Sequence, residues 1–280
     1  MSLPGRLVEV NGVRLHVSEH GPASGAPVLL LHGFPDSSSL WRHQVPALVE
    51  AGYRVIAPDL RGFGLSDRPA EVDAYALPTL MGDTLGLFDA LGIARAHVVC
   101  HDWGAALGWG LAMFAPEKID RFAALSVGHF GSFFETGIEQ REKSWYMLFF
   151  QYEGIAEDAL RANDWKLFRE WTRNHPELPR WLEDLSRPGA LTAALNWYRA
   201  NVNPARPGLE GTPFPAVKVP TLGIWSTGDA YLTESQMIAS KSFVAGDWRY
   251  ERLENASHWM QLDQPARVNA LVLDWLGREK

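Results

Sequence analysis

The segment Ala96–Glu117, AHVVCHDWGAALGWGLAMFAPE, decides the fold of this chain. An apolar run ends abruptly at the charged Asp102, and an Ala/Gly-rich stretch typical of a helix follows. Because Cys100 and Gly104 are small, the backbone can make a sharp strand-to-helix turn that exposes the central side chain at the carboxyl end of a sheet. Two interpretations fit this turn alone: Asp102 is a nucleophile, or it is the N-cap of the helix.

Strand and helix patterns alternate on both sides of this segment. The first two strand-like segments flank Asn11-Gly12, a dipeptide typical of a tight hairpin turn. Strands are expected at RLVEVNG, VRLHVSEH, APVLLLHGFP, YRVIAPDL, AHVVCHD, RFAALSV, TLGIWS and WRYERL. Helices are expected over about Ser38–Glu50, Leu77–Leu91, Ala105–Phe114, Thr233–Ser242 and Pro265–Leu276. This alternation indicates an α/β fold, with a mostly parallel twisted sheet flanked by helices.

A helical insertion interrupts this alternation. The strand signal stops after about Phe130, and a region dense in Trp, Phe, Glu and Arg follows, with short Pro/Gly breaks. The tract NPARPGLEGTPFPAVKVP then forms a return linker, after which strands and helices alternate again. We therefore predict one α/β core, residues 1–130 and 215–280, that holds a helical cap at residues 131–214.

The bulk composition excludes several classes of function. The 280 residues carry a net charge of −7 without a Lys/Arg cluster, which argues against nucleic acid and membrane surfaces as partners. No apolar run approaches the roughly 18 residues of a membrane span. The start MSLPGRLVEVNG lacks the pattern of a signal peptide, and the lone Cys100 forms no internal disulfide. We expect a cytoplasmic protein, monomeric or homodimeric, that binds a small ligand. No spacing is typical of metal ligands, so neither a metal nor an organic cofactor is expected.

Two distant segments favour the nucleophile interpretation of Asp102. His258 lies in the loop segment ENASHWMQLDQP, and Asp229 follows a buried strand in the segment IWSTGDAYL. Taken singly, a loop histidine is more often a solvated surface residue, and Asp229 more often a turn former. All three residues fall at carboxyl strand ends, where open α/β sheets place their ligand crevice, and their chain order is that of α/β hydrolases. We therefore predict a catalytic triad of Asp102, Asp229 and His258.

The loop HGFP, which leaves a central strand, is expected to complete the site. It would offer the backbone N–H of Phe34, together with that of Trp103, as an oxyanion hole. His32 is expected to brace this loop. In the segment DLRGFGLSD, we expect Asp59 and Arg61 to pair.

Segments that are similar to those of one family cover nearly the whole chain. They are HGFPDSSSLWRHQVPALVEAGYRVIAPDLRGFGLSDRP, HDWGAALGWGLAMFAPEKI, SWYMLFFQYEGIAE, LNWYRANV, GDAYL and NASHWMQLDQP. On these segments the chain resembles the α/β-hydrolase-fold epoxide hydrolases, whose HGFP and HDWG motifs also occur in haloalkane dehalogenases. The resemblance implies that Tyr146 and Tyr198, in the cap, are the tyrosines that act on the epoxide. Tyr152-Glu153 stand where relatives often have an acidic residue and Pro, a departure that bears on cavity shape.

An aspartate nucleophile predicts an alkyl substrate. Attack by a serine on an sp³ carbon would leave a stable ether, whereas Asp102 would become an alkyl ester whose carbonyl water can still attack. His258, oriented by Asp229, is the expected general base for that water. The tyrosine hydroxyls implied by the resemblance would donate to the epoxide oxygen as it takes up charge. We therefore expect an epoxide hydrolase that converts a small apolar epoxide to a vicinal diol.

Two other functions stay open from the sequence. A haloalkane or haloacid dehalogenase would use the same nucleophile, and dehalogenases of this fold hold the halide with two N–H donors. Trp103 fits the first donor position, whereas Phe34 stands where an Asn would be the second. A non-catalytic ligand receptor on the same fold is the third possibility, and the intact triad argues against it.

Overall fold

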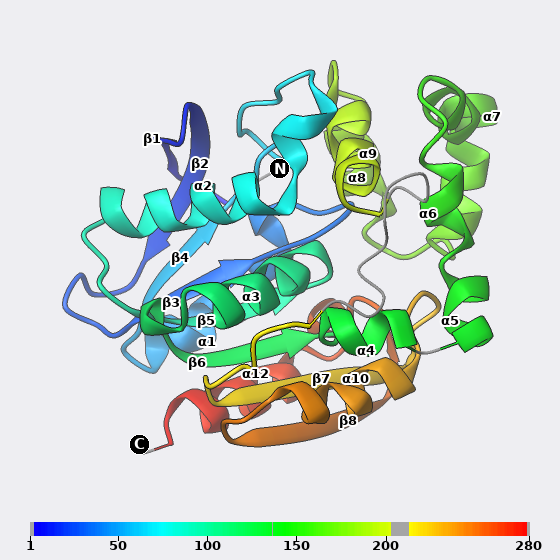
Figure 1. Cartoon of the computed structure of the whole chain (residues 1–280). Coiled ribbons are helices and arrows are strands. Elements are labelled where there is room, and N and C mark those ends of the chain that lie inside the picture. Colours follow the sequence, from blue (N-terminus) through cyan, green and yellow to red (C-terminus); the bar gives the residue numbers. More distant parts are fainter. Residues whose placement is uncertain (1–2, 136, 203–212, 279–280) are drawn as a thin grey trace.

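Eight strands form one mostly parallel sheet in the computed structural model, which describes residues 3–135, 137–202 and 213–278 (Figure 1). The strands are β1 (Arg6–Val10), β2 (Val13–His20), β3 (Pro27–Leu31), β4 (Arg54–Pro58), β5 (Ala96–His101), β6 (Ile119–Leu125), β7 (Thr221–Gly228) and β8 (Trp248–Ser257). Their order across the sheet is β1-β2-β4-β3-β5-β6-β7-β8. β2 runs antiparallel to β1 and β4, and the remaining neighbours are parallel. The predicted α/β architecture is confirmed.

Local sequence explains how these strands form. Asn11 and Gly12 in the β1–β2 hairpin have φ angles of 46° and 76°, the positive values that such a tight turn requires. β3, β5 and β6 are continuous apolar runs, and nearly all of their residues are buried because the sheet is covered on both faces. These parallel strands direct their carboxyl ends to the same edge of the sheet, where the predicted site residues follow.

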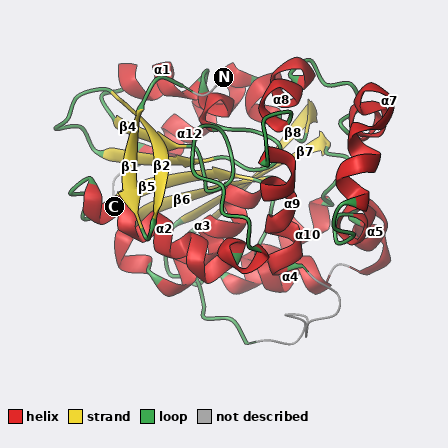
Figure 2. Cartoon of the chain, turned by 90° about the horizontal axis from the view of Figure 1, so that it is seen from above, coloured by secondary structure: helices red, strands yellow, loops and turns green. Residues whose placement is uncertain are grey.

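Helices cover both faces of the sheet (Figure 2). On one face lie α2 (Leu77–Ala90), α3 (Trp103–Phe114) and α10 (Glu234–Ala239), and on the other lie α1 (Gln44–Glu50) and α12 (Pro265–Leu276). The short helix α11 (Met260–Asp263) precedes α12. Short 3₁₀ turns occur at Ser38–Trp41, Val72–Tyr75, Pro116–Lys118 and Ser240–Phe243.

The helix that we expected over Ser38–Glu50 is divided. A 3₁₀ turn at Ser38–Trp41 comes first, and α1 begins only at Gln44. Pro46 explains the break, because it has no N–H and its ring would clash with the carbonyl of Arg42 in a continuous α-helix.

The loop after β4 is also braced differently from our expectation. Arg61, which we expected to bind Asp59, forms a bidentate ion pair with Asp83 of α2 at 2.6 and 2.7 Å. Asp59 accepts the backbone N–H groups of Ser38 and Leu65, each at 2.8 Å. The two side chains therefore bind different partners: Arg61 binds α2, and Asp59 binds backbone N–H groups.

A helical segment separates β6 from β7 in the chain. It contains α4 (Phe130–Glu135), α5 (Gly137–Lys143), α6 (Trp145–Phe149), α7 (Ile155–Trp171), α8 (Leu178–Leu185) and α9 (Ala190–Asn201). α4 packs beside α10, whereas α5–α9 stand beyond the carboxyl edge of the sheet (Figure 1). The limits of a separate cap at residues 131–214 stay a prediction, and the part of the linker at residues 203–212 lies outside the described residues.

Candidate active site

Asp102 lies in the turn between β5 and α3. Its φ and ψ angles are 53° and −123°, a backbone conformation that residues with a side chain rarely adopt. Gly104 makes room for the turn, because a Cβ there would collide with the backbone oxygens of Leu31 and His32 at the end of β3. The turn is so sharp that α3 begins at Trp103, two residues before the predicted start. This is the geometry of a nucleophile elbow.

The hydrogen bonds of Asp102 do not support its interpretation as a helix cap. In the described structure its carboxylate makes no cap hydrogen bond to α3. Oδ1 instead accepts the backbone N–H of Phe34 at 2.7 Å, and the backbone N–H of Trp103 is among the groups that lower the pKa of Asp102. Gly33 permits this approach, because a Cβ there would collide with the Asp102 side chain. Both N–H groups predicted for the oxyanion hole therefore lie beside the carboxylate.

His32 holds the loop that carries Phe34. Its Nε2 accepts the backbone N–H of Leu60 at 3.0 Å, so Nδ1 carries the proton and donates to the carbonyl of Gly33 at 3.0 Å. Burial lowers the pKa of His32, which keeps the ring neutral for both bonds. The expected bracing role is consistent with these contacts.

His258 lies between the two aspartates. Its Nδ1 is 2.8 Å from Oδ2 of Asp229, and its Nε2 is 3.5 Å from Oδ2 of Asp102. Oδ1 of Asp229 accepts the backbone N–H groups of Tyr231 and Leu232 at 2.8 and 3.0 Å, which fixes that carboxylate. His258 and Asp229 are buried, whereas 14% of the Asp102 side chain is exposed. The structure thus brings together the three residues that the sequence placed at separate strand ends.

The charges of these three residues depend on one another. Burial by itself would lower the pKa of His258, but the carboxylates of Asp229 and Asp102 outweigh it and raise the pKa to about 10. Burial by itself would raise the pKa of Asp102, but His258 reverses the direction and holds that pKa below its ordinary value. The resting site is therefore an imidazolium between two carboxylates.

His101 fixes the backbone of the histidine loop. Its Nε2 lies 2.9 Å from the carbonyl oxygen of His258, and the Ser126 hydroxyl donates to the same oxygen at 3.2 Å. Burial, helped by the neighbouring His258, lowers the pKa of His101 to about 3. His101 is therefore neutral and donates through Nε2–H, so no second cation stands beside His258, whose ring centroid is 4.5 Å away.

Tyr146 on α6 and Tyr198 on α9 lie close together in a buried cluster of rings. Their ring centroids are 5.9 Å apart, and Tyr198 lies 5.0 Å from Trp103 beside the nucleophile. Burial first, and the negative charge of Asp102 second, raise the pKa of both tyrosines well above the usual range. Both hydroxyls therefore stay protonated and can donate. We call the surrounding rings the aromatic cluster: Phe34, Tyr146, Phe150, Phe168, Trp171 and Tyr198.

Tyr231 is a site residue that sequence reasoning missed. Its ring lies 5.1 Å from His258 and 5.8 Å from Tyr146, and its hydroxyl donates to the carbonyl of Trp171 at 2.7 Å. The segment GDAYL held a partial signal, since Tyr231 follows Asp229 by two residues. The partner of Tyr231 is a helix backbone 60 residues away in the chain, which no local pattern reveals.

Among residues 3–135, 137–202 and 213–278, no group of three or more His, Cys, Asp or Glu side chains is arranged to hold a metal ion. Within the same residues, none of the helices has the length and apolarity that a membrane crossing requires.

Together, the fold and the site define an α/β hydrolase with a carboxylate at its nucleophile elbow. Comparison with known families agrees, because residues 26–265 match the α/β hydrolase fold family. The AB hydrolase superfamily protein YfhM of Bacillus subtilis (strain 168) is 36% identical, over 98% of each chain. Epoxide hydrolase A of Mycobacterium tuberculosis is 33% identical, over 97% of this chain and 96% of its own.

Solved structures give the same result. Epoxide Hydrolase A from Mycobacterium thermoresistibile is similar with a TM-score of 0.81 and 30% identity, over 99% of each chain. A Bacillus megaterium epoxide hydrolase in complex with an inhibitor is similar with a TM-score of 0.87 and 26% identity, over 98% of this chain and 100% of its own. The chain belongs to the epoxide hydrolase branch of the α/β-hydrolase family.

Proposed function

We propose that this protein hydrolyses epoxides to vicinal diols in two steps, with Asp102 as nucleophile and His258, oriented by Asp229, as base. The relatives that are named epoxide hydrolases support the reaction class. The observation that carries the proposal is the pair of buried, protonated tyrosines, Tyr146 and Tyr198, close to a carboxylate at the elbow. A carboxylate nucleophile suits an sp³ carbon, and phenolic donors suit a leaving oxygen.

In the first step, Oδ2 of Asp102 bonds to an epoxide carbon while the ring carbon–oxygen bond breaks. The N–H of Phe34 binds Oδ1, which leaves Oδ2 as the attacking atom. The epoxide oxygen leaves as an alkoxide and takes a proton from Tyr146 or Tyr198. Ester formation also removes the negative charge that helps to raise the pKa of both tyrosines. The donors therefore become more acidic as the alkoxide forms.

The second step hydrolyses the ester. The charge of Asp102 is one cause of the raised pKa of His258, so forming the ester lowers that pKa. The imidazolium of His258 then gives its proton to the tyrosine that lost one in the first step. Neutral His258 next accepts a proton from the water that attacks Cγ of Asp102. The N–H groups of Phe34 and Trp103 would stabilise the oxyanion on Oδ1. When the Cγ–Oδ2 bond breaks, Oδ2 takes the second proton of that water and leaves with the diol, and the carboxylate keeps the oxygen of the water.

We also propose that α5–α9 act as the cap of this site. They carry both tyrosines, and most of the aromatic cluster belongs to them. These apolar rings suit a small apolar epoxide as the substrate. A cytoplasmic location and a monomeric or homodimeric state stay predictions from the sequence.

Dehalogenation is the second candidate, and one observation favours it. The indole N–H of Trp103 is buried beside the nucleophile, and such a donor can hold a halide leaving group. The second donor position is Phe34, whose ring offers no N–H. A weakly basic halide would also make little use of two phenolic proton donors, so we rank this function below epoxide hydrolysis.

Single-turnover hydrolysis in heavy-oxygen water tests the proposal. With enzyme in excess over styrene oxide, we expect the label in the peptide that bears Asp102, while the diol carries the original Asp102 oxygen. His258→Gln should accumulate an adduct with the mass of the epoxide added to the intact protein. Label in the diol with Asp102 unlabelled would contradict the covalent step. Halide release from a haloalkane, with no diol from any epoxide, would favour the dehalogenase.

A further inference from the structure

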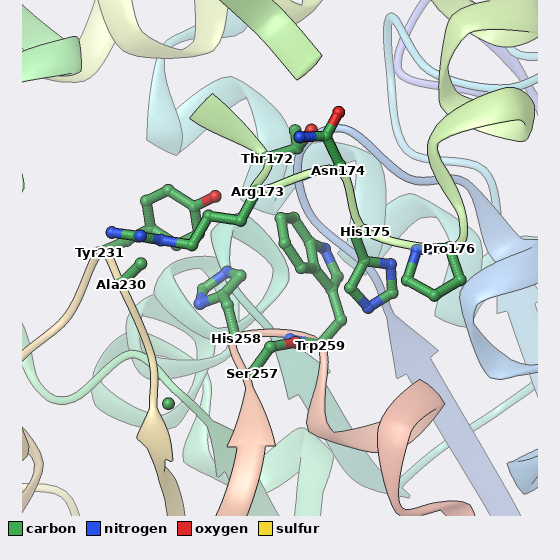
Figure 3. Close-up of a pocket in the computed structure, with 11 residues that line it drawn as sticks. Thr172, Arg173, Asn174, His175, Pro176, Ala230, Tyr231, Ser257, His258 and Trp259 are labelled. Atoms are coloured by element: carbon green, nitrogen blue, oxygen red, sulfur yellow. The ribbon is translucent and has the colours of Figure 1, made fainter. Parts of the chain in front are cut away.

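A hollow borders His258 on the side of the α7–α8 connection. Its volume is about 170 Å³, enough for several water molecules. Figure 3 shows the imidazole of His258 between Tyr231 and the indole of Trp259, with Arg173 extending above it. The hollow is lined by residues 172–176 of that connection, by residues 257–259, and by Ala230 and Tyr231 of the loop that carries Asp229, which we call the acid loop. Arg173, Asn174 and Pro176 are exposed, so the hollow reaches the protein surface.

This hollow is separate from the place where the epoxide would react. Asp102, Tyr146 and Tyr198 do not line it. Tyr231 lies between the two regions, with its ring 5.8 Å from that of Tyr146 on one side and 5.1 Å from that of His258 on the other. The Tyr231 hydroxyl donates to the carbonyl of Trp171, and this bond fixes the ring between the two regions. His258 is therefore the residue shared by the triad and the hollow.

The mouth of the hollow is open to bulk water. The exposed side chains of Arg173 and Asn174 stand there, and apolar surface makes up most of the remaining lining. Because the hollow reaches the surface, water can enter it as far as His258. By contrast, Tyr146 and Tyr198 are buried, and the region around them is walled by the apolar rings of the aromatic cluster.

We propose that this hollow holds and supplies the water that hydrolyses the Asp102 ester, by a route that the epoxide does not use. The inference rests on the proposed function, because it concerns the second of its two steps. Once the ester forms, the alkyl group fills the space beside the aromatic cluster and obstructs water from that side. Water in the hollow does not have to pass the alkyl group. It reaches the site at His258, the base that activates it, which lines the inner end of the hollow.

Filling the hollow from either wall tests this proposal. Ala230→Leu fills it from the acid loop, and Pro176→Trp fills it from the α7–α8 connection. For each variant, we expect hydrolysis of the ester to slow on the order of tenfold while its formation keeps the wild-type rate. Stopped-flow tryptophan fluorescence and rapid-quench intact mass, with styrene oxide, resolve the two rates. The double variant should slow hydrolysis little more than either single variant, because the route is already closed.

Matched controls separate filling from disturbance of the loops. Ala230→Gly and Pro176→Ala remove the same side chains without filling, and Ala266→Leu adds the same bulk on the exposed face of α12. All three should keep the wild-type hydrolysis rate. If Ala230→Leu does not fold, Pro176→Trp decides alone. An unchanged hydrolysis rate in the filled variants, or equal slowing in the unfilled controls, would overturn the water route. Absence of any ester would instead overturn the proposed function.

Discussion

The negative charge of Asp102 links the residues of this site. It helps to raise the pKa of His258 to about 10, and it adds to the raised pKa of Tyr146 and Tyr198. Alkylation removes that charge in one event. The tyrosines then become better proton donors and His258 becomes a better base, so the product of the first step prepares the groups that the second step needs.

This linkage predicts that the two steps respond differently to pH. Because the pKa of Asp102 is lowered from 3.8, the nucleophile stays ionised, and ester formation persists, until pH falls below that value. Hydrolysis needs neutral His258, whose pKa in the ester lies below the value of about 10 in the resting site. It therefore slows as pH falls through that lowered pKa, and ester should accumulate in acid. Rapid-quench intact mass between about pH 5 and 9 measures both rates.

The control for this pH series is far-UV circular dichroism at each pH, which identifies conditions where the fold is retained. A parallel fall of both rates with pH, without accumulation of ester, would contradict the linkage through Asp102.

At the same scale, the sequence predicted some residues and missed others for physical reasons. Asp102, Asp229 and His258 follow strands in a recognisable order, so chain position alone predicts that they meet. Tyr231 was missed because its role depends on the backbone of Trp171, which is far away in the chain. Local patterns predict where a strand ends, but not which distant backbone lies beside it.

At the scale of elements, the buried Arg199 connects the two tyrosine-bearing helices, α6 and α9, and anchors both to α7. Arg199, next to Tyr198 on α9, forms a bidentate pair with Glu157 of α7 at 2.8 and 2.9 Å. Its Nε also donates at 2.9 Å to the carbonyl of Phe150, the residue that follows α6. Arg199 and Glu157 are both buried. This contact fixes α9 relative to the helix that carries Tyr146.

We therefore predict that Glu157→Gln slows ester formation on the order of 10- to 100-fold, because Tyr146 and Tyr198 lose their mutual position. Hydrolysis of an ester already formed should keep its rate, since the triad lies outside this contact. Rapid-quench kinetics with styrene oxide separate the two rates. Tyr146→Phe with Tyr198→Phe gives the reference, and should slow ester formation by about 10²- to 10⁴-fold.

Glu170→Gln is the matched control for the charge change. Glu170 pairs with Lys166 at 3.9 Å on the surface of α7, beyond the break in its helical backbone at residues 162–165, and both side chains are mostly exposed. Glu170→Gln should form and hydrolyse the ester at the wild-type rates. If Glu157→Gln slowed ester hydrolysis as much as ester formation, the contact would be a general structural support rather than a device that positions the tyrosines.

Helix boundaries show what element-level prediction can achieve. The helix predicted over Pro265–Leu276 has those bounds in the structure, because Pro265 marks its start and its apolar residues recur on one face. The helix predicted over Ser38–Glu50 is divided between Trp41 and Gln44, just before Pro46, which the apolar pattern alone did not reveal. The order of the α/β core was predictable from periodicity, whereas the packing of α5–α9 depends on pairings such as Arg199 with Glu157.

At the scale of the whole molecule, the inserted helices and the sheet share one hydrophobic core. A single cluster of buried apolar residues extends from the strands through Phe34 to the rings on α6–α9. Polar contacts cross the same boundary: the Gln140 amide donates to the carbonyl of Tyr231 at 2.8 Å, and Lys143 donates to that of Asp229 at 3.0 Å. The indole of Trp197 donates to the carbonyl of Arg61 at 3.0 Å. Separate folding of the insertion would therefore expose buried rings on both sides.

We accordingly predict that the insertion and the core unfold together. Tryptophan fluorescence and far-UV circular dichroism should report coincident urea transitions, because the 12 Trp residues include several on the inserted helices, whereas dichroism reports the whole chain. Gln140→Ala should lower the urea midpoints of both signals equally. The free energy of unfolding should fall by about 1–3 kcal/mol, because the change leaves buried polar partners in the acid loop without a bond. Gln264→Ala, at a partly exposed site on the sheet side, is the control. A fluorescence transition that precedes the dichroism transition in wild type would show that α5–α9 unfold on their own, and the shared core would then not couple them to the sheet.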